Sequence, residues 1–137
     1  MRKGLLGILV VAVLCSGAAM AQGPKADVFK GKLFPPNVIL ENQDQLNLTK
    51  DQYTAIRAAV VEVQENVAEH EWDVRDAYRS LMAELDQTPI DETQVMAYVD
   101  EALAAENAVK REQVMMLIKL KNLLDDEQIA YLESVRK

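Results

Sequence analysis

The chain has 137 residues and a formal net charge of −7, with 22 acidic residues against 15 basic ones. This acidity argues against binding nucleic acid, because phosphate recognition needs clustered lysine and arginine. All five glycines lie at or before Gly31, and the chain holds one histidine and one cysteine. A glycine-rich phosphate loop is therefore excluded. The common serine and cysteine catalytic sets are disfavoured, because the only cysteine lies in the segment that is expected to be removed, and we predict neither enzymatic activity nor a cofactor.

Residues 1–21 have the pattern of a secretory signal peptide. Two basic residues are followed by an apolar stretch and by the small-residue sequence Ala-Met-Ala at 19–21, which is typical of a cleavage site. We expect cleavage after Ala21, which removes Cys15 and changes the net charge from −7 to −9 because two basic residues are lost. Lipidation of Cys15 is disfavoured by Leu14 before it. Retention as a membrane anchor stays open, because residues 5–21 are uncharged.

Residues 22–34 contain three lysines against one aspartate and show no sustained apolar periodicity. This composition predicts a flexible basic arm. Two prolines at 35 and 36 end the arm, and residues 36–46 are compatible with a short helix because proline suits a first helical turn. We therefore expect one helical domain over residues 35–137.

A long helix is predicted to start after Thr49. The Thr49 hydroxyl can accept from the backbone of Gln52, and the Gln52 side chain can reach back to the Thr49 backbone, which is the arrangement of a capping box. Apolar residues then recur at intervals of three and four as far as Leu85, and Pro89 prevents continuation. The predicted helix has about 37 residues and is about 55 Å long.

A second long helix is predicted to start after Asp91, which can cap it together with Gln94. Apolar residues recur from Val95 through Leu103 and Val109 to Leu123. The short turn makes the two long helices antiparallel neighbours. Three opposite pairs are expected: Met82 with Met96, His70 with Val109, and Ile56 with Leu123.

A variant of the first motif opens the last predicted helix. Its leucine, capping residue and glutamine are Leu124, Asp125 and Gln128, where the first copy has Leu48, Thr49 and Gln52. Aspartate caps a helix as well as threonine does. The predicted fold is all-α: a long antiparallel helical hairpin with short flanking helices at both ends of the chain, which places both motifs at its open end.

A signal peptide, four predicted helices and two L-T-x-x-Q-type motifs 76 residues apart resemble the LTxxQ superfamily of periplasmic proteins. That superfamily includes Spy-like and CpxP-like chaperones and envelope stress response proteins, and the heavy-metal resistance proteins related to ZraP and CnrX. The resemblance covers residues 35–137 and departs from the pattern at Asp125. It implies a cradle-shaped helical homodimer in the periplasm, without enzymatic activity.

The resemblance leaves two classes of function open. One is an ATP-independent chaperone or stress modulator that binds unfolded or envelope proteins, or a membrane sensor protein. The other is a sensor or resistance protein for zinc, nickel or cobalt, whose members carry several histidines. Only His70 is present here, and a histidine absorbed between helices is the simpler interpretation. Weak additional ligand candidates are Asp73, Glu106, Glu112, Met115 and Met116.

Two further sets of residues bear on binding surfaces. The methionines at 82, 96, 115 and 116 are predicted to fill the core, because methionine at helical spacing usually does. Trp72 lies off the apolar line of its helix, near Arg75 and Arg79. It is predicted to contact a second subunit or a client, or to be covered by the terminal helices. The two arginines can also pair with neighbouring acidic residues.

Overall fold

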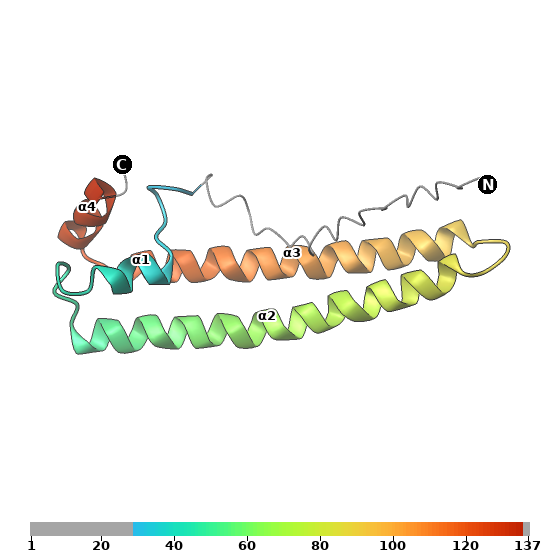
Figure 1. Ribbon diagram of the computed structural model, residues 1–137, viewed down its shortest axis with the longest axis horizontal. Coiled ribbons are helices and arrows are strands. Elements are labelled where there is room, and N and C mark those ends of the chain that lie inside the picture. The colour runs from blue at the N-terminus through green and yellow to red at the C-terminus, as the bar shows by residue number, and fades with distance from the viewer. Residues whose placement is uncertain (1–28, 136–137) are drawn as a thin grey trace, which may run out of the picture.

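The computed structural model describes residues 29–135, and within this range it contains four helices and no strand (Figure 1). These are α1 (Pro36–Glu41), α2 (Lys50–Leu85), α3 (Glu92–Asn122) and α4 (Asp126–Val135). The prediction of an all-α fold with two long packed helices is confirmed. The predicted signal peptide and residues 22–28 of the predicted arm lie outside the described residues. Between residues 29 and 135, no helix combines the length and apolar composition needed to cross a membrane.

Helices α2 and α3 lie side by side along their length and are joined by residues 86–91 (Figure 1). We call their line of mutual contact the seam. It buries Ile56, Val63, Ala77 and Leu81 of α2 and Ala102, Val109 and Leu120 of α3. Spacings of three and four along each helix give the period of 3.5 residues that keeps one side turned to a partner helix.

The structure corrects the predicted seam at Leu85, which is 42% exposed, and at Leu103. Leu103 was expected to face inward, but half of its surface is exposed, and its neighbour Ala102 is buried instead. Ala102 continues the spacing that starts at Val95 and Val99 and reaches Val109, whereas Leu103 interrupts it. The small alanine also allows the two helices to approach each other closely.

The main core lies at the open end of the α2–α3 pair, where the short helices join it (Figure 1). Its buried members come from all four helices and from the segments before α1, α2 and α4, and are Phe34, Ile39, Leu46, Ile56, Ala59, Leu120, Leu124 and Leu132. Toward the turn, the described part of the chain consists of the two long helices alone (Figure 1). A two-helix layer cannot cover its own outer faces there.

Residues 29–34 belong to the folded part, which differs from the predicted boundary of the basic arm. The Phe34 side chain is fully buried in the core. Lys121 of α3 donates a hydrogen bond from Nζ to the carbonyl oxygen of Lys32 (2.7 Å), and the same ammonium lies 5.7 Å from the centroid of the Phe34 ring. The buried Phe34 side chain and the Lys121 hydrogen bond therefore attach this segment to the core, although its composition resembles that of a flexible arm.

The prediction that the methionines fill the core is wrong for three of the four. Met82 is 59% exposed, Met96 54% and Met115 51%. Only Met116 packs against the core. Helical spacing brings a side chain to a face of its helix, but a core also requires another element above that face, and no described helix lies over these three.

Candidate functional site

The first motif forms the predicted capping box at the start of α2. Thr49 Oγ1 accepts a hydrogen bond from the backbone N–H of Gln52 (3.1 Å), and the Thr49 N–H donates to Gln52 Oε1 (3.1 Å). The motif leucine, Leu48, packs against the core. The motif therefore starts the helix and anchors it to the core.

The second motif forms the same box at the start of α4. Asp125 Oδ1 accepts from the Gln128 N–H (2.8 Å), and the Asp125 N–H donates to Gln128 Oε1 (3.0 Å). Its leucine, Leu124, is buried in the core. Aspartate thus replaces threonine without loss of either hydrogen bond, because both side chains place an oxygen within reach of the N–H groups at the helix start.

The two motifs are joined directly through their glutamines. Gln52 Nε2 donates to Gln128 Oε1 (2.8 Å), and Gln128 Nε2 donates to Gln52 Oε1 (3.1 Å). Each amide also donates to a backbone carbonyl oxygen from another segment: Gln52 to that of Leu123 (2.8 Å) and Gln128 to that of Leu46 (3.0 Å). We call these two side chains the glutamine pair. Gln128 is 7% exposed, so its hydrogen bonds replace contacts with water.

The glutamine pair was not predicted from the sequence. The available signal was the equivalence of the two motifs, since each places a glutamine three residues after its capping residue and the predicted hairpin brings both to one end. A shallow pocket of about 420 Å³ lies beside the pair, and Thr49, Asp125 and Tyr131 help to line it. Because the amide and capping groups at this pocket are engaged in internal hydrogen bonds, the geometry supports a structural role for the motifs.

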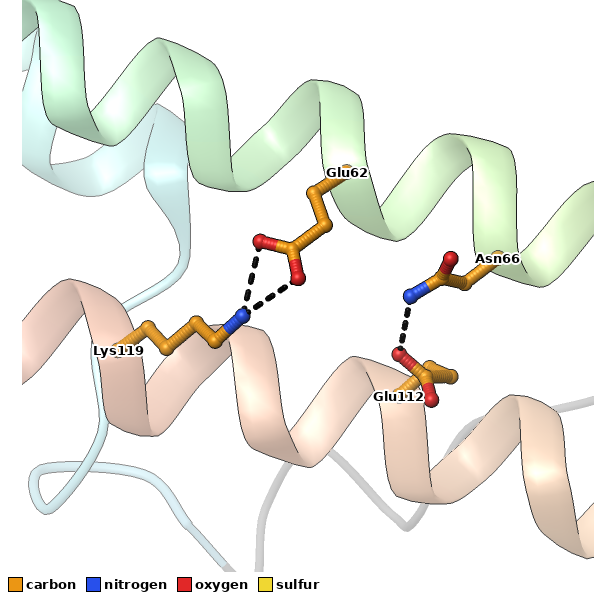
Figure 2. Close-up of polar contacts among 4 residues, drawn as sticks. All are labelled: Glu62, Asn66, Glu112 and Lys119. Atoms are coloured by element: carbon orange, nitrogen blue, oxygen red, sulfur yellow. Dashed lines mark hydrogen bonds and ion pairs between the residues drawn. The ribbon is translucent and has the colours of Figure 1, made fainter.

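The weak metal-ligand candidates do not converge. Glu112 accepts a hydrogen bond from Asn66 Nδ2 (2.9 Å; Figure 2), and Glu106 accepts one from the Tyr78 hydroxyl (2.7 Å). His70 is half-buried, whereas Asp73 is exposed. Across residues 29–135, no group of three or more histidine, cysteine, aspartate or glutamate side chains is placed to hold a metal ion. Met115 is exposed, whereas Met116 packs against the core, so the two side chains lie in different environments.

Polar contacts link α2 to α3 at two neighbouring levels in Figure 2. Lys119 Nζ contacts both carboxylate oxygens of Glu62 at 2.7 and 2.8 Å, and Asn66 bonds to Glu112. The Glu62–Lys119 ion pair is half-exposed, and such pairs contribute about 0–1 kcal/mol. These contacts depend on the register of the two helices.

The Tyr78–Glu106 contact changes the acidity of the tyrosine. Its hydrogen bond to the carboxylate, the negative charge of Glu106 and partial desolvation all raise the pKa of Tyr78 above 10.0. The hydrogen bond between the Tyr78 hydroxyl and the Glu106 carboxylate thus links α2 to α3.

Trp72 is exposed, as expected for a residue that contacts a second subunit or a client. Its side chain is 61% accessible, and the Arg75 guanidinium lies 5.1 Å from its ring centroid. Arg79 instead pairs with Asp76 at 3.1 Å on the solvated surface. Neither α1 nor α4 covers Trp72, so the predicted alternative of intramolecular cover by the terminal helices does not occur.

Other large apolar side chains are exposed in the same half of the molecule. We define the turn half as residues 66–106. The exposed members there, which we call the turn-half apolar surface, are Trp72, Tyr78, Met82, Leu85, Ile90, Met96 and Leu103. Three of them, Tyr78, Met82 and Leu85, share one face of α2 because they are four and three residues apart. The open end of the α2–α3 pair is therefore held together by the core and the glutamine pair, whereas the turn half carries exposed apolar side chains.

Comparisons of this chain with protein-family models, with curated proteins and with solved structures found no match. The resemblance to the LTxxQ superfamily therefore rests on the two motifs and the order of the helices.

Proposed function

We propose that this protein is a periplasmic, non-enzymatic chaperone or envelope-stress modulator of the LTxxQ type, which holds unfolded proteins without ATP. The observation that carries the proposal is the turn-half apolar surface, on which Trp72 is 61% and Met82 59% exposed. Large apolar side chains that are exposed together in one half of a soluble protein indicate a surface that binds another molecule. Methionine suits varied clients because its flexible side chain adapts to different partners.

The glutamine pair supports the assignment of a structural role to the open end and a binding role to the turn half. It fixes the starts of α2 and α4 at the open end, where the main core lies. The turn half has no further helix of residues 29–135 packed on it, so its apolar side chains are available to a partner. The proposal also includes a homodimer, because an isolated two-helix layer leaves apolar surface uncovered, and it includes export through residues 1–21.

The proposed function is tested by light scattering from an aggregating unfolded client, at stoichiometric ratios and without ATP. The parent protein is expected to suppress aggregation, and Trp72→Glu and Met82→Glu are expected to weaken suppression because each places a charge in the apolar surface. Val61→Glu is a matched control, because Val61 is 46% exposed on α2 but lies outside the turn half. Absence of suppression by the parent, or equal loss in all three variants, would refute the proposal.

The proposed location is tested separately by the intact mass of the protein recovered from a periplasmic fraction. Cleavage after Ala21 predicts a chain that begins at Gln22. A full-length, membrane-bound species would instead support the uncleaved anchor.

A further inference from the structure

Near the turn, α2 and α3 each turn a row of apolar side chains to the same side of the pair. The members of each row are three and four residues apart and therefore share one face of their helix. The Tyr78 hydroxyl donates a hydrogen bond to Glu106 (2.7 Å), which lies one turn beyond Leu103, so the two faces adjoin across the seam. We call this combined surface the turn-end face, and its members are Tyr78, Met82, Leu85, Met96, Val99 and Leu103.

The turn-end face is open. Val99 is half-buried, and the other five members are between 40% and 59% exposed. Helix α1 and the segment before it lie toward the open end of the pair, where Phe34 and Ile39 are buried in the core (Figure 1). No described part of the chain therefore covers the turn-end face, and an apolar face of this kind indicates contact with another molecule.

The turn-end face lies in a strongly acidic part of the chain. Residues 80–109 hold seven acidic residues and no basic one. The two basic residues of the turn half, Arg75 and Arg79, lie before this stretch and are already engaged. Arg75 lies over the Trp72 ring, and Arg79 pairs with Asp76. The electrostatic potential around the turn-end face is therefore negative, which favours a cationic partner.

Three acidic side chains border the turn-end face directly. Asp86 follows Leu85 in the chain, and Glu92 and Asp100 lie one helical turn before and after Met96. All three are exposed, and none forms an ion pair with another residue of the described part of the chain. Their carboxylates are therefore available to the lysine and arginine side chains of a partner.

We propose that the turn-end face binds basic amphipathic segments of other proteins. The inference rests on the proposed chaperone function and names its class of client. The apolar side of such a segment packs on Met82, Met96 and their neighbours, whose flexible side chains adapt to different partners. Its lysine and arginine side chains reach the bordering carboxylates. Acidic segments and anionic lipid surfaces are repelled by the same charges.

Three synthetic helical peptides test the proposal by fluorescence anisotropy. They have equal length and the same leucine face, and their other face carries lysine, glutamine or glutamate. The lysine peptide is expected to bind with a micromolar dissociation constant, and the glutamate peptide at least about tenfold more weakly. The glutamine peptide should lie between them. High salt should reduce the difference, because it screens exposed charges.

Matched variants test which surface is responsible. Asp100→Lys is expected to weaken binding of the lysine peptide by about fivefold and to strengthen binding of the glutamate peptide. Glu101→Lys is the control, because it makes the same charge change on the same helix but one residue further on, away from the turn-end face. It should change either dissociation constant by less than about twofold. Met96→Ser should weaken all three peptides, because it removes apolar contact area.

Circular dichroism verifies that each variant keeps the helix content of the parent. Equal binding of the three peptides, or equal effects of Asp100→Lys and Glu101→Lys, would overturn the proposed charge selection. Unchanged binding in Met96→Ser would overturn the assignment of the surface. Binding that weakens as the protein concentration rises would show that a second copy of the chain covers this face, which would also overturn the proposal.

The same peptides separate this inference from the chaperone function on which it rests. Charge-selective peptide binding without suppression of aggregation would refute the chaperone function and leave the turn-end face standing as a binding surface. Suppression of aggregation without charge-selective peptide binding would refute this inference and leave the chaperone function standing.

Discussion

The side-chain amides of Gln52 and Gln128 hydrogen-bond to each other in both directions, although 76 residues separate them in the chain. Each amide oxygen also caps its own helix, and each amide nitrogen also donates to a carbonyl oxygen of a neighbouring segment. The glutamine of each motif thus performs two tasks, starting a helix and joining two helix starts. Only the first task is visible within the motif itself.

Replacement of the glutamine pair should show strong coupling. We expect Gln52→Ala and Gln128→Ala each to lower the free energy of unfolding by about 2 kcal/mol, because each removes several hydrogen bonds and leaves partly buried partners unsatisfied. The double variant should lose about 1 kcal/mol less than the two single losses together. Urea unfolding measures all three, with exposed Gln64→Ala as the control. Strict additivity would contradict the pair.

The capping residues should be exchangeable. Thr49→Ala and Asp125→Ala are each expected to destabilise the protein by about 1 kcal/mol, because each removes an acceptor for an N–H group at a helix start. Thr49→Asp and Asp125→Thr retain an acceptor and should change stability by less than about 0.5 kcal/mol. Thermal unfolding measures these effects. If the alanine variants melt like the parent but no longer hold clients, the motif is a recognition surface.

The two ends of the molecule should respond differently to truncation. Leu120 is fully buried at the open end, so Leu120→Ala is expected to cost about 2–5 kcal/mol by removing apolar contacts and leaving a cavity. Met82 is 59% exposed, so Met82→Ala should cost less than about 1 kcal/mol. Chemical denaturation of both variants provides the comparison. A large cost for Met82→Ala would show that this side chain is covered in solution.

The Tyr78–Glu106 hydrogen bond should be visible at alkaline pH. The pKa of Tyr78 is raised in the folded protein, chiefly by its hydrogen bond to Glu106, so the neutral tyrosine stabilises the fold. This contribution is complete below the unfolded pKa of about 10 and is lost as the pH rises through the higher folded pKa. Difference titration by ultraviolet absorbance, with Tyr78→Phe as the reference, isolates this group. Glu106→Gln should lower the pKa, and an unchanged value would contradict the assigned cause.

Metal binding should be weak. The Glu106 and Glu112 carboxylates are engaged with side chains of α2, and a single imidazole with carboxylates forms an incomplete site for zinc, nickel or cobalt. We expect dissociation constants no tighter than about 10 μM. Calorimetry with each metal tests this, with His70→Ala beside the parent. Submicromolar binding that disappears in His70→Ala would favour the metal-sensor alternative.

Local signals in the sequence specify where the long helices begin and where the first of them ends. Thr49 and Gln52 form the predicted capping box of α2. At the start of α3 the Asp91 carboxylate accepts a hydrogen bond from the Gln94 backbone N–H, and Pro89 lies in the turn between the two helices. These signals act between residues no more than about four positions apart. Apolar spacing likewise identified most of the seam, since it needs only the geometry of one helix and the presence of a neighbour.

Which side chains are buried and which polar groups form hydrogen bonds depends on how the helices pack in three dimensions. The spacing of Met82 and Met96 resembles that of core residues, yet both are exposed because no described helix packs over them. Phe34, in contrast, is buried because it packs against α3. The glutamine pair depends on how α2 and α4 are placed relative to each other. The spacing of residues in the sequence specifies the face of a helix on which a side chain lies. Whether that side chain is buried or hydrogen-bonded depends on which other element packs against that face.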